Sequence, residues 1–244
     1  MNAHEVRQLA HAEESYWWHR GRQRIVKRVL SRYVPSGSRI LDVGCGPGGT
    51  TQSYAGNGRV LAADASPEST RIARSRGLTV ATMEATHLAV RPGSCDAIVS
   101  LDLIEHIDDD ERALREMYDA LRPGGALVVT VPAYQFLWSS HDVAVGHKRR
   151  YTKGQLVRLA KRAGFEIELA AYAMSSIFPA AMAIRLAERL RPKREHPQAN
   201  FVKLPRVANA LLERIVGLGP QPLRFVPVPF GLSIVLVGRR PADG

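Results

Sequence analysis

The sequence predicts an α/β fold in which a mostly parallel, doubly wound sheet is covered by helices on both faces. Short apolar segments alternate with segments of helical periodicity as far as Pro132, and this alternation is typical of βαβ units. The first apolar segment, RILDV, runs directly into the glycine-rich segment GCGPGG. A glycine-rich turn between a strand and a helix is typical of such sheets, which bind ligands at the carboxyl ends of their strands.

Size and composition favour a single globular domain. The chain has 244 residues, of which 45% are hydrophobic, and this is enough for one sizeable core. Its two cysteines, Cys45 and Cys95, suit neither a disulfide framework nor a zinc-type spacing, so a reducing cytoplasm is expected. The N-terminal segment is polar, unlike a signal peptide. The longest uncharged segment, Leu169–Ile184, is shorter than the ~20 residues of a membrane span, so none is predicted.

The net charge of +11 has two explanations. It indicates attraction to an anionic partner, such as a nucleic acid, a membrane surface or an acidic substrate. It is equally consistent with a generally basic, arginine-rich proteome. The sequence leaves both open.

Periodicity and breakers place the elements along the chain. After a helical segment that ends at residue 33, the predicted strands are 39–44, 59–66, 78–85, 95–103, 126–132, 166–173 and 231–240, and the main helices are 67–76, 109–121 and 152–165. Two amphipathic helices, around 177–190 and 207–216, lie between the last two strands. We therefore predict one domain, 1–244, made of a helical cap (1–34), a core (35–135), a loop, helix and strand (136–172), a helical insertion (173–230) and a last strand (231–240).

The glycine-rich segment carries the first chemical information. Glycines let the backbone approach a ligand closely, and the helix that follows offers unpaired N–H groups. Asp64 ends the second predicted strand, where a carboxylate can accept both hydroxyls of a ribose. Asp42 directly precedes the glycines, where it would repel a pyrophosphate but suits a ligand with a cationic end. A tight turn at the glycines and a helix cap at Asp64 are the structural alternatives.

The segments ILDVGCGPGG, LAADAS and CDAIVSLDLIEHIDDDERALREMYDALRPGGALVVTVPAY resemble the core of class I S-adenosylmethionine-dependent methyltransferases. They are most similar to the broad small-molecule group, of the methyltransferase type 11/12-like kind. The resemblance covers about Tyr16 to Phe165 and resumes at the last strand. It implies a Rossmann-like sheet of seven strands, with the first five parallel and the last antiparallel. It also implies S-adenosylmethionine as cofactor and S-adenosylhomocysteine as product.

The resemblance assigns cofactor contacts residue by residue. The glycine motif matches the segment that wraps the methionine part, and Asp64 matches the ribose-binding carboxylate. Glu84 and Ala85 match a pair beside the adenine that is usually Asp-Ala. WWHRGR resembles an N-terminal WWF-R-G-R-R motif, although His19 and Gln23 depart from it. The implied cofactor set is Trp18, Arg22, Asp42, Gly44, Cys45, Gly46, Gly48, Asp64, Ala65, Glu84, Ala85, Leu101 and Asp102.

The segment HDVAVGHKRRY follows the fifth predicted strand and should face the same crevice. A pattern like W-HD-x-x-x-GH-x-RRY recurs at this place in the group that the chain resembles. The candidate catalytic residues are therefore His141, Asp142 and His147, and the candidate substrate-binding residues are Tyr134, Trp138 and Tyr151. In a second interpretation Arg149, Arg150 and Tyr151 hold the loop, and in a third the cations of 148–150 bind phosphate.

Neither a metal site nor a catalytic role for His106 is the leading prediction. The spacing of His141, Asp142 and His147 fits neither one helix face nor a usual zinc pattern, so we expect no metal. Glu105 and His106 are expected to open a helix and to cap and pack it, with a catalytic His106 as the alternative.

Methyl transfer from a sulfonium is an in-line displacement, in which positioning can contribute roughly 7–11 kcal/mol. A general base is needed only if the nucleophile arrives protonated, and histidine suits that task. The predicted acceptor is a small apolar, lipid-like or natural-product molecule, with the acceptor atom (N, O or C) left open. A nucleic-acid methyltransferase is the alternative that the charge favours, although LDLIEH lacks an Asn-Pro-Pro-Tyr-like motif. A non-catalytic binding module and a dinucleotide oxidoreductase are further alternatives.

The helical insertion is predicted to be a lid or an interface, with a dimer left open. Contact with an anionic membrane at its inner face is the alternative to a purely cytoplasmic location, because cations cluster there. They are Arg185, Arg189, Arg191, Lys193 and Arg194.

Overall fold

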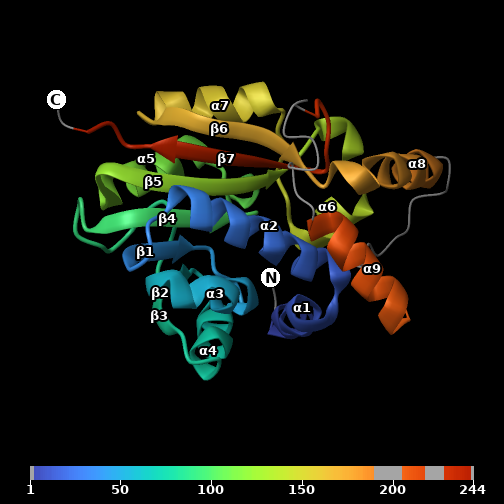
Figure 1. The fold of residues 1–244 in the computed structure, drawn as a ribbon, viewed down its shortest axis with the longest axis horizontal. Helices are drawn as coiled ribbons and strands as arrows, with labels where there is room; N and C mark the ends of the chain where they lie inside the picture. The colour runs from blue at the N-terminus through green and yellow to red at the C-terminus, as the bar shows by residue number, and fades with distance from the viewer. Residues whose placement is uncertain (1–2, 190–204, 218–227, 243–244) are drawn as a thin grey trace.

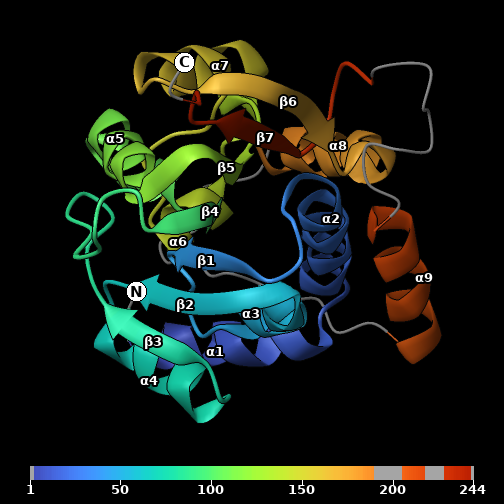
Figure 2. The ribbon, with the colours of Figure 1, turned by 60° about the vertical axis from the view of Figure 1, so that its left-hand side comes forward.

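The computed structural model describes residues 3–189, 205–217 and 228–242, and these form one seven-stranded mixed sheet. The strand order is β3-β2-β1-β4-β5-β7-β6, which Figure 2 shows as a twisted fan. β1 to β5 are parallel, and β7 runs antiparallel to both of its neighbours, which confirms the predicted fold class. The strands are β1 (Ser38–Val43), β2 (Gly58–Asp64), β3 (Thr79–Thr82), β4 (Cys95–Leu101), β5 (Leu121–Pro132), β6 (Glu166–Ala173) and β7 (Ser233–Arg239).

The central strands are apolar because helices cover both of their faces. Almost every residue of β4, β5 and β7 is buried. The fifth strand begins at Leu121, five residues before the predicted start at Ala126. The turn-like RPGG was therefore misplaced outside the strand. Leu121 pairs with Cys95, and the register then shifts before Ala97 pairs with Ala126, so an irregularity in the ladder accommodates the glycines.

Helices cover the sheet in two layers (Figure 1). On one face, α5 (Asp110–Ala120) and α7 (Lys153–Arg162) bury Leu114, Met117 and Leu156. The opposite face carries α2, α3, α4 and α9. Each layer presents an apolar stripe at helical spacing, as the sequence predicts. The helices of the second layer are α2 (Trp17–Tyr33), α3 (Gly49–Tyr54), α4 (Pro67–Ser75) and α9 (Arg206–Gly217).

The N-terminal cap is two helices instead of one continuous stretch. α1 (Ala3–Ser15) ends before Tyr16, whose extended backbone separates it from α2. The break turns α1 across the glycine loop, where the Glu13 carboxylate accepts a 2.9 Å hydrogen bond from the Gly49 N–H. The cap therefore contacts the loop directly.

The insertion returns one of its helices to the cap. α9 packs along α2 so closely that a Cβ on Gly21 would lie 2.5 Å from Val216 Cγ1. Glu213, buried in α9, forms ion pairs with Arg20 and Arg24 of α2. The predicted cations Arg191, Lys193 and Arg194 lie outside the described residues. Among the helices that the structure describes, none is long and apolar enough to cross a bilayer.

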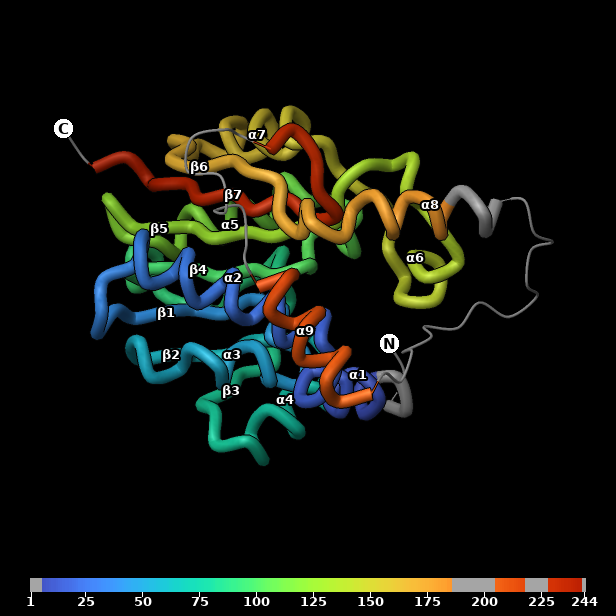
Figure 3. Tube along the Cα trace, turned by 45° about the vertical axis from the view of Figure 1, so that its right-hand side comes forward, coloured from blue at the N-terminus to red at the C-terminus, as the bar shows by residue number. Residues whose placement is uncertain are grey.

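The remaining short elements, except η1, which precedes β2, lie near the carboxyl ends of the strands. α6 and α8 extend past this edge of the sheet, and α1 lies below them (Figure 3). These elements are α6 (Ser140–Val145), α8 (Phe178–Arg189) and the 3₁₀ turns η1 (Ala55–Asn57), η2 (Ile104–His106), η3 (Gln135–Leu137) and η4 (Ser175–Ile177).

Candidate functional site

Backbone strain marks the carboxyl edge of the sheet. Asp102, Tyr134 and Met174 are the non-glycine residues of the described chain with positive φ, at 50°, 59° and 58°. They follow β4, β5 and β6, respectively, at or just past the strand end. Left-handed backbone at residues with a Cβ costs of order 1–3 kcal/mol and is concentrated at functional sites. The strain therefore points to the edge where the sequence placed the site.

The glycine loop lies at the centre of this edge. Gly44 and Gly46 have φ values of 80° and 55°, which favour glycine. The Gly46 N–H donates to Asp64 Oδ2 at 2.9 Å, while Asp64 Oδ1 accepts the Ser66 N–H at 2.8 Å. These two bonds fix the carboxylate at the end of β2 and leave lone pairs for further donors. The structure thus brings together the glycine loop and the acidic residue at the end of the second strand, both predicted to contact the cofactor.

Asp42, which is predicted to contact the cofactor, lies beneath the glycine loop. It is buried, and one of its oxygens accepts hydrogen bonds from Thr51 Oγ1 and Tyr54 Oη, both at 2.5 Å. Burial raises the pKa of Asp42 to about 6, because the two hydroxyl bonds only partly offset desolvation. Asp42 therefore joins β1 to α3 from beneath the loop.

Glu13 is a part of this loop that the sequence did not reveal. Its buried carboxylate accepts the Gly49 N–H and also the Thr50 N–H at 3.3 Å, at the N-terminus of α3. Arg76 Nη1 donates to the same carboxylate at 3.0 Å. Glu13 lies 36 residues before Gly49, and a helix-face glutamate is an ordinary surface residue in sequence terms, so no local pattern could have indicated it.

Arg22 and Asp102, both predicted to face the cofactor, form an ion pair. The Thr130 hydroxyl donates to the other Asp102 oxygen at 3.0 Å. Burial alone would raise the pKa of Asp102, but Arg22 and Thr130 hold it below its ordinary value. The pair connects α2 to the end of β4. Among the described contacts, it is the only ion pair between the WWHRGR and LDLIEH motifs. It lies beside the glycine loop.

The other predicted cofactor residues are spread along the same edge. Trp18 is half-buried and packs edge-on against Trp17, with ring centroids 5.8 Å apart. Cys45 is buried, and burial raises the pKa of its thiol. Ala65 and Glu84 are exposed, whereas Ala85 and Leu101 are buried. This set remains a prediction for each side chain.

Asp142 is the centre of the predicted catalytic segment. It is completely buried and accepts hydrogen bonds from Ser139 N at 2.9 Å, His147 Nδ1 at 2.7 Å and Arg150 Nε at 2.7 Å. Burial would raise the pKa of Asp142, but His147 and Arg150 hold it well below the ordinary value. These partners all belong to the same loop, so Asp142 organises the loop from within.

The neighbouring cations also have acidic partners. Lys148 pairs with Asp108, and Arg149 Nη1 lies 3.0 Å from Asp110 Oδ2. The buried Tyr151 hydroxyl donates to the same Asp110 oxygen at 2.7 Å. These contacts favour the interpretation in which the cations hold the loop over the one in which they bind phosphate. They also indicate that Tyr151 anchors the loop.

Glu105, His106 and His147 come together between β4 and this loop. Glu105 and His106 form the short 3₁₀ turn η2 with Ile104, and α5 begins separately at Asp110. Glu105 is fully buried, and burial raises the pKa of its carboxyl well above the ordinary value. His147 Nε2 lies 3.8 Å from Glu105 Oε1, and the rings of His106 and His147 are 4.8 Å apart.

Two further histidines lie near these groups. Burial lowers the pKa of His141, and the charge of Arg185 adds to that effect. Burial, with Arg22 nearby, lowers the pKa of His19 to about 3. Both imidazoles are therefore neutral at pH 7. Trp138 is half-buried beside this segment.

An aromatic cluster (Tyr134, Phe136, Tyr172, Phe178 and Phe230) continues the edge beyond β5. Tyr134 stacks on Phe136 and on Tyr172, with centroids 5.0 and 5.1 Å apart, and meets Phe178 edge-on at 5.9 Å. Phe178 in turn contacts Phe230 at 5.2 Å. Phe136 and Phe230 remain 50% and 38% exposed. The cluster is thus apolar and presents two partly exposed rings, Phe136 and Phe230.

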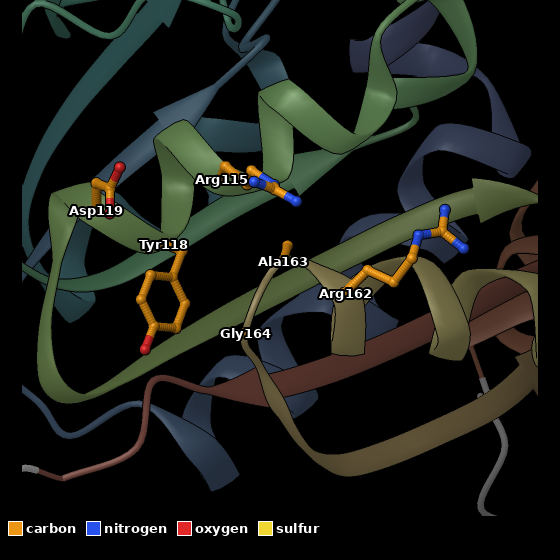
Figure 4. A pocket seen from close by; sticks show the side chains of 6 residues that line it. All are labelled: Arg115, Tyr118, Asp119, Arg162, Ala163 and Gly164. Carbon is orange, nitrogen blue, oxygen red and sulfur yellow. The ribbon is translucent and has the colours of Figure 1, made fainter.

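A separate pocket lies at the opposite edge of the sheet. It is lined by the C-terminal parts of α5 and α7, including Tyr118, Asp119 and Gly164 (Figure 4). These parts precede β5 and β6, and therefore lie at the amino ends of those strands. Its two arginines, Arg115 and Arg162, both pair with Glu111. The pocket has no part in the glycine-loop site.

A family model of the methyltransferase domain matches residues 17–170. The chain belongs to the methyltransferase-domain family. The match spans the glycine loop, Asp64, Asp102 and the whole HDVAVGHKRRY segment, so both sides of the site lie within it. The chain is therefore an S-adenosylmethionine-dependent methyltransferase domain of class I, as the resemblance implied, and S-adenosylmethionine is its cofactor.

Curated relatives share only part of their length with this domain. A tRNA (carboxymethyluridine(34)-5-O)-methyltransferase of Mus musculus is 32% identical over 51% of this chain and 18% of its own. A ubiquinone biosynthesis O-methyltransferase of Xanthomonas axonopodis is 34% identical over 42% of this chain and 46% of its own. A probable S-adenosylmethionine-dependent methyltransferase of Mycolicibacterium smegmatis is 28% identical over 64% and 62%. The chain thus spans less than two thirds of each of these relatives.

Solved structures share the fold along nearly the whole chain. A methyltransferase of Haloferax volcanii, solved with the Trm112 activator, matches with a TM-score of 0.64 and 21% identity over 98% of this chain and 96% of that one. A phosphoethanolamine N-methyltransferase of Haemonchus contortus, solved with S-adenosyl-L-methionine, matches with a TM-score of 0.57 and 25% identity over 88% and 51%.

The residues at the glycine loop fit this cofactor. Apart from its chain neighbours, the described atom nearest to a Cβ built on Gly46 is Leu9 Cδ2, at 3.9 Å, so the backbone is open on that side. Asp64, held by the Gly46 N–H, would accept the ribose hydroxyls, and Arg22, which pairs with Asp102, would face the carboxylate of the methionine part if the resemblance holds for it. When bound, the cofactor supplies an electrophilic methyl group on a sulfonium.

Proposed function

We propose that this domain transfers the methyl group of S-adenosylmethionine to a small acceptor that has an apolar or aromatic portion. The aromatic cluster carries the proposal. It follows β5 and β6 at the same edge as the glycine loop, and two of its members are open to solvent. Pockets for small ligands combine such apolar walls with a few placed polar groups.

The polar groups beside the aromatic cluster suit an acceptor with a protonated nucleophile. His141 is kept neutral by burial, so its imidazole can accept a proton at pH 7. His147 is oriented by Asp142 through Nδ1 and presents Nε2. The bound cofactor would supply an electrophilic methyl group for in-line displacement, with a neutral thioether as the leaving group. A histidine beside it would take the proton of the nucleophile.

The acceptor side can be tested with a matched pair of surface variants. Phe136→Ser removes an apolar ring that is 50% exposed in the cluster, whereas Leu211→Ser removes a side chain that is 58% exposed on α9. We expect Phe136→Ser to raise the KM for an aromatic acceptor about tenfold, because the bound acceptor then buries less apolar surface. Leu211→Ser should leave KM unchanged. Equal KM values in wild type and Phe136→Ser would contradict the assigned surface.

The acceptor class can be identified without assuming its structure. Purified protein and methyl-labelled cofactor are incubated with a cell extract, and the label is then separated into solvent-extractable molecules and ribonuclease-sensitive polymer. Label in the extractable fraction supports the proposal. Label in RNA would overturn it in favour of a tRNA acceptor, for which the net charge of +11 and the similarity to a tRNA methyltransferase speak.

A further inference from the structure

We propose that Glu105, His106 and His147 bind one divalent transition-metal ion beside the methyl-transfer site. Their ligand atoms all lie within 4.8 Å of one another. Two come from η2, directly after β4, and the third from the loop after α6. The two segments are held together by a 2.9 Å hydrogen bond from Lys148 N to the Glu105 carbonyl. The assignment does not depend on the identity of the methyl acceptor.

The protonation of both imidazoles is determined by what their Nδ1 atoms contact. His106 Nδ1 lies 3.1 Å from the carbonyl oxygen of Gly146, which can only accept, so Nδ1 carries the proton. His147 Nδ1 lies 2.7 Å from Asp142 Oδ1, an oxygen that also accepts from Arg150 Nε at 2.7 Å. A ring that carries its proton on Nδ1 has its lone pair on Nε2. An oxygen acceptor on the far nitrogen is the usual support of a metal-binding histidine.

Glu105 supplies the observation that points to a ligand. Its side chain is fully buried, yet neither carboxylate oxygen has a hydrogen-bond partner among the described residues. Oε1 lies 3.8 Å from His147 Nε2, which is too far for a hydrogen bond but close enough for both atoms to bind one ion. A buried carboxylate without a partner is strongly unfavourable. A cation between the three groups satisfies it.

The ligand types define the class of ion. Ligands about 2.0–2.2 Å from a shared zinc ion are separated by about 3.5 Å, so the three groups need to close by only about 1 Å. Two imidazoles and one carboxylate suit zinc, iron, manganese or cobalt. Magnesium and calcium prefer oxygen ligands and are disfavoured. Three protein ligands leave at least one position open.

This assignment replaces the expectation that the protein binds no metal. It also gives different roles to the histidines and the aspartate of the loop. The spacing argument tested His141, Asp142 and His147, of which only His147 is a ligand. Asp142 orients that ligand from behind. With His147 Nε2 bound to an ion, His141 remains the histidine that is available as a base.

The ion can be tested by titration in the absence of acceptor. Protein is treated with a chelator, and Zn²⁺ binding is measured by calorimetry, with Co²⁺ absorption as a probe of nitrogen ligands. We expect one site per chain. The absence of one-to-one Zn²⁺ binding would overturn the proposal, as would a Co²⁺ spectrum equal to that of the hydrated ion.

Three variants assign the site to these residues. Glu105→Gln keeps the shape of the acid, and His147→Gln removes a nitrogen ligand; each should weaken Zn²⁺ binding by at least about 100-fold. His87→Gln changes a histidine of the β3–β4 loop that contacts Arg112, and should bind Zn²⁺ as wild type does. Unchanged cofactor affinity in all three shows that the fold is intact. Wild-type Zn²⁺ affinity in Glu105→Gln would refute the site, whether or not any acceptor is methylated.

Discussion

Asp42 on the glycine-loop side and Asp142 on the histidine side are both buried, yet their surroundings shift the pKa in opposite directions. Asp42 meets two neutral hydroxyls, and burial raises its pKa to about 6. Asp142 meets Arg150 and His147, which hold its pKa low despite burial. Burial without a cation favours the protonated acid, whereas burial beside a guanidinium favours the charge.

The contrast reflects how the two sides are built. The glycine-loop side is formed by the backbone of one short segment, with a carboxylate from the next strand to orient it. The histidine side is formed by side chains from the ends of several strands and from α6, held by charge pairs. The glycine-loop side can bury Asp42 as a neutral acid, whereas the histidine side buries charged groups that need partners.

The largest expected effect is the loss of Asp142. Asp142→Ala leaves Arg150 and His147 without their buried partner and should lower the free energy of unfolding by about 3–5 kcal/mol. Urea unfolding measures the change. Asp108→Ala is the control, because Asp108 is 84% exposed in its pair with Lys148 and should matter little. Equal stability of the two variants would show that the loop is not organised around Asp142.

The pH dependence of stability tests the raised pKa of Asp42. Asp42 in the folded protein holds its proton from about pH 4 up to about pH 6, where the unfolded chain has released it. The native state binds more protons in this window, so stability falls as the pH rises through it. Relative to Asp42→Asn, wild type should lose about 2 kcal/mol between pH 4 and pH 7. Denaturant unfolding across this range measures the difference, and a constant difference would mean that Asp42 is ionised throughout.

Cofactor binding tests whether the glycine-loop side depends on one carboxylate. Asp64→Ala removes the acceptor for the Gly46 N–H and for the ribose hydroxyls, and should weaken S-adenosylmethionine binding about 100-fold. Calorimetry measures the affinity. Asp96→Ala serves as the control, because among the described residues the Asp96 carboxylate bonds to Arg39 and Arg122 alone. Identical affinities for both variants and wild type would refute the cofactor assignment.

The smallest effect concerns the contact between α1 and the loop. Glu13→Gln removes the charge from the N-terminus of α3 and from Arg76, and should lower the free energy of unfolding by about 1 kcal/mol. Glu14→Gln is the matched change one residue later, on a side chain that is 65% exposed and pairs with the same arginine. Thermal unfolding of the two proteins compares them. A larger effect from Glu14→Gln would mean that the carboxylate charge stabilises the N-terminal cap and not the glycine loop.

Much of the fold and of the glycine-loop side could be predicted because the responsible residues are neighbours. Strand, glycine turn and helix follow one another in RILDVGCGPGG, and Asp64 ends the next strand. The start of β5 was misplaced because RPGG looks like a turn, whereas its pairing with β4 depends on a shifted register. The single predicted N-terminal helix is two, because the break at Tyr16 has no glycine or proline to announce it.

By itself, the sequence determined the sheet, the glycine turn and the position of HDVAVGHKRRY after the fifth strand, because each depends on residues close together in the chain. Only the tertiary structure decided that Glu13 caps α3, that α9 returns to α2, and that Asp142 is internal. It also decided that Glu105 and His106 meet His147, about forty residues away in the chain. Such contacts depend on which strand ends are neighbours in the sheet, and local spacing carries no information about that order.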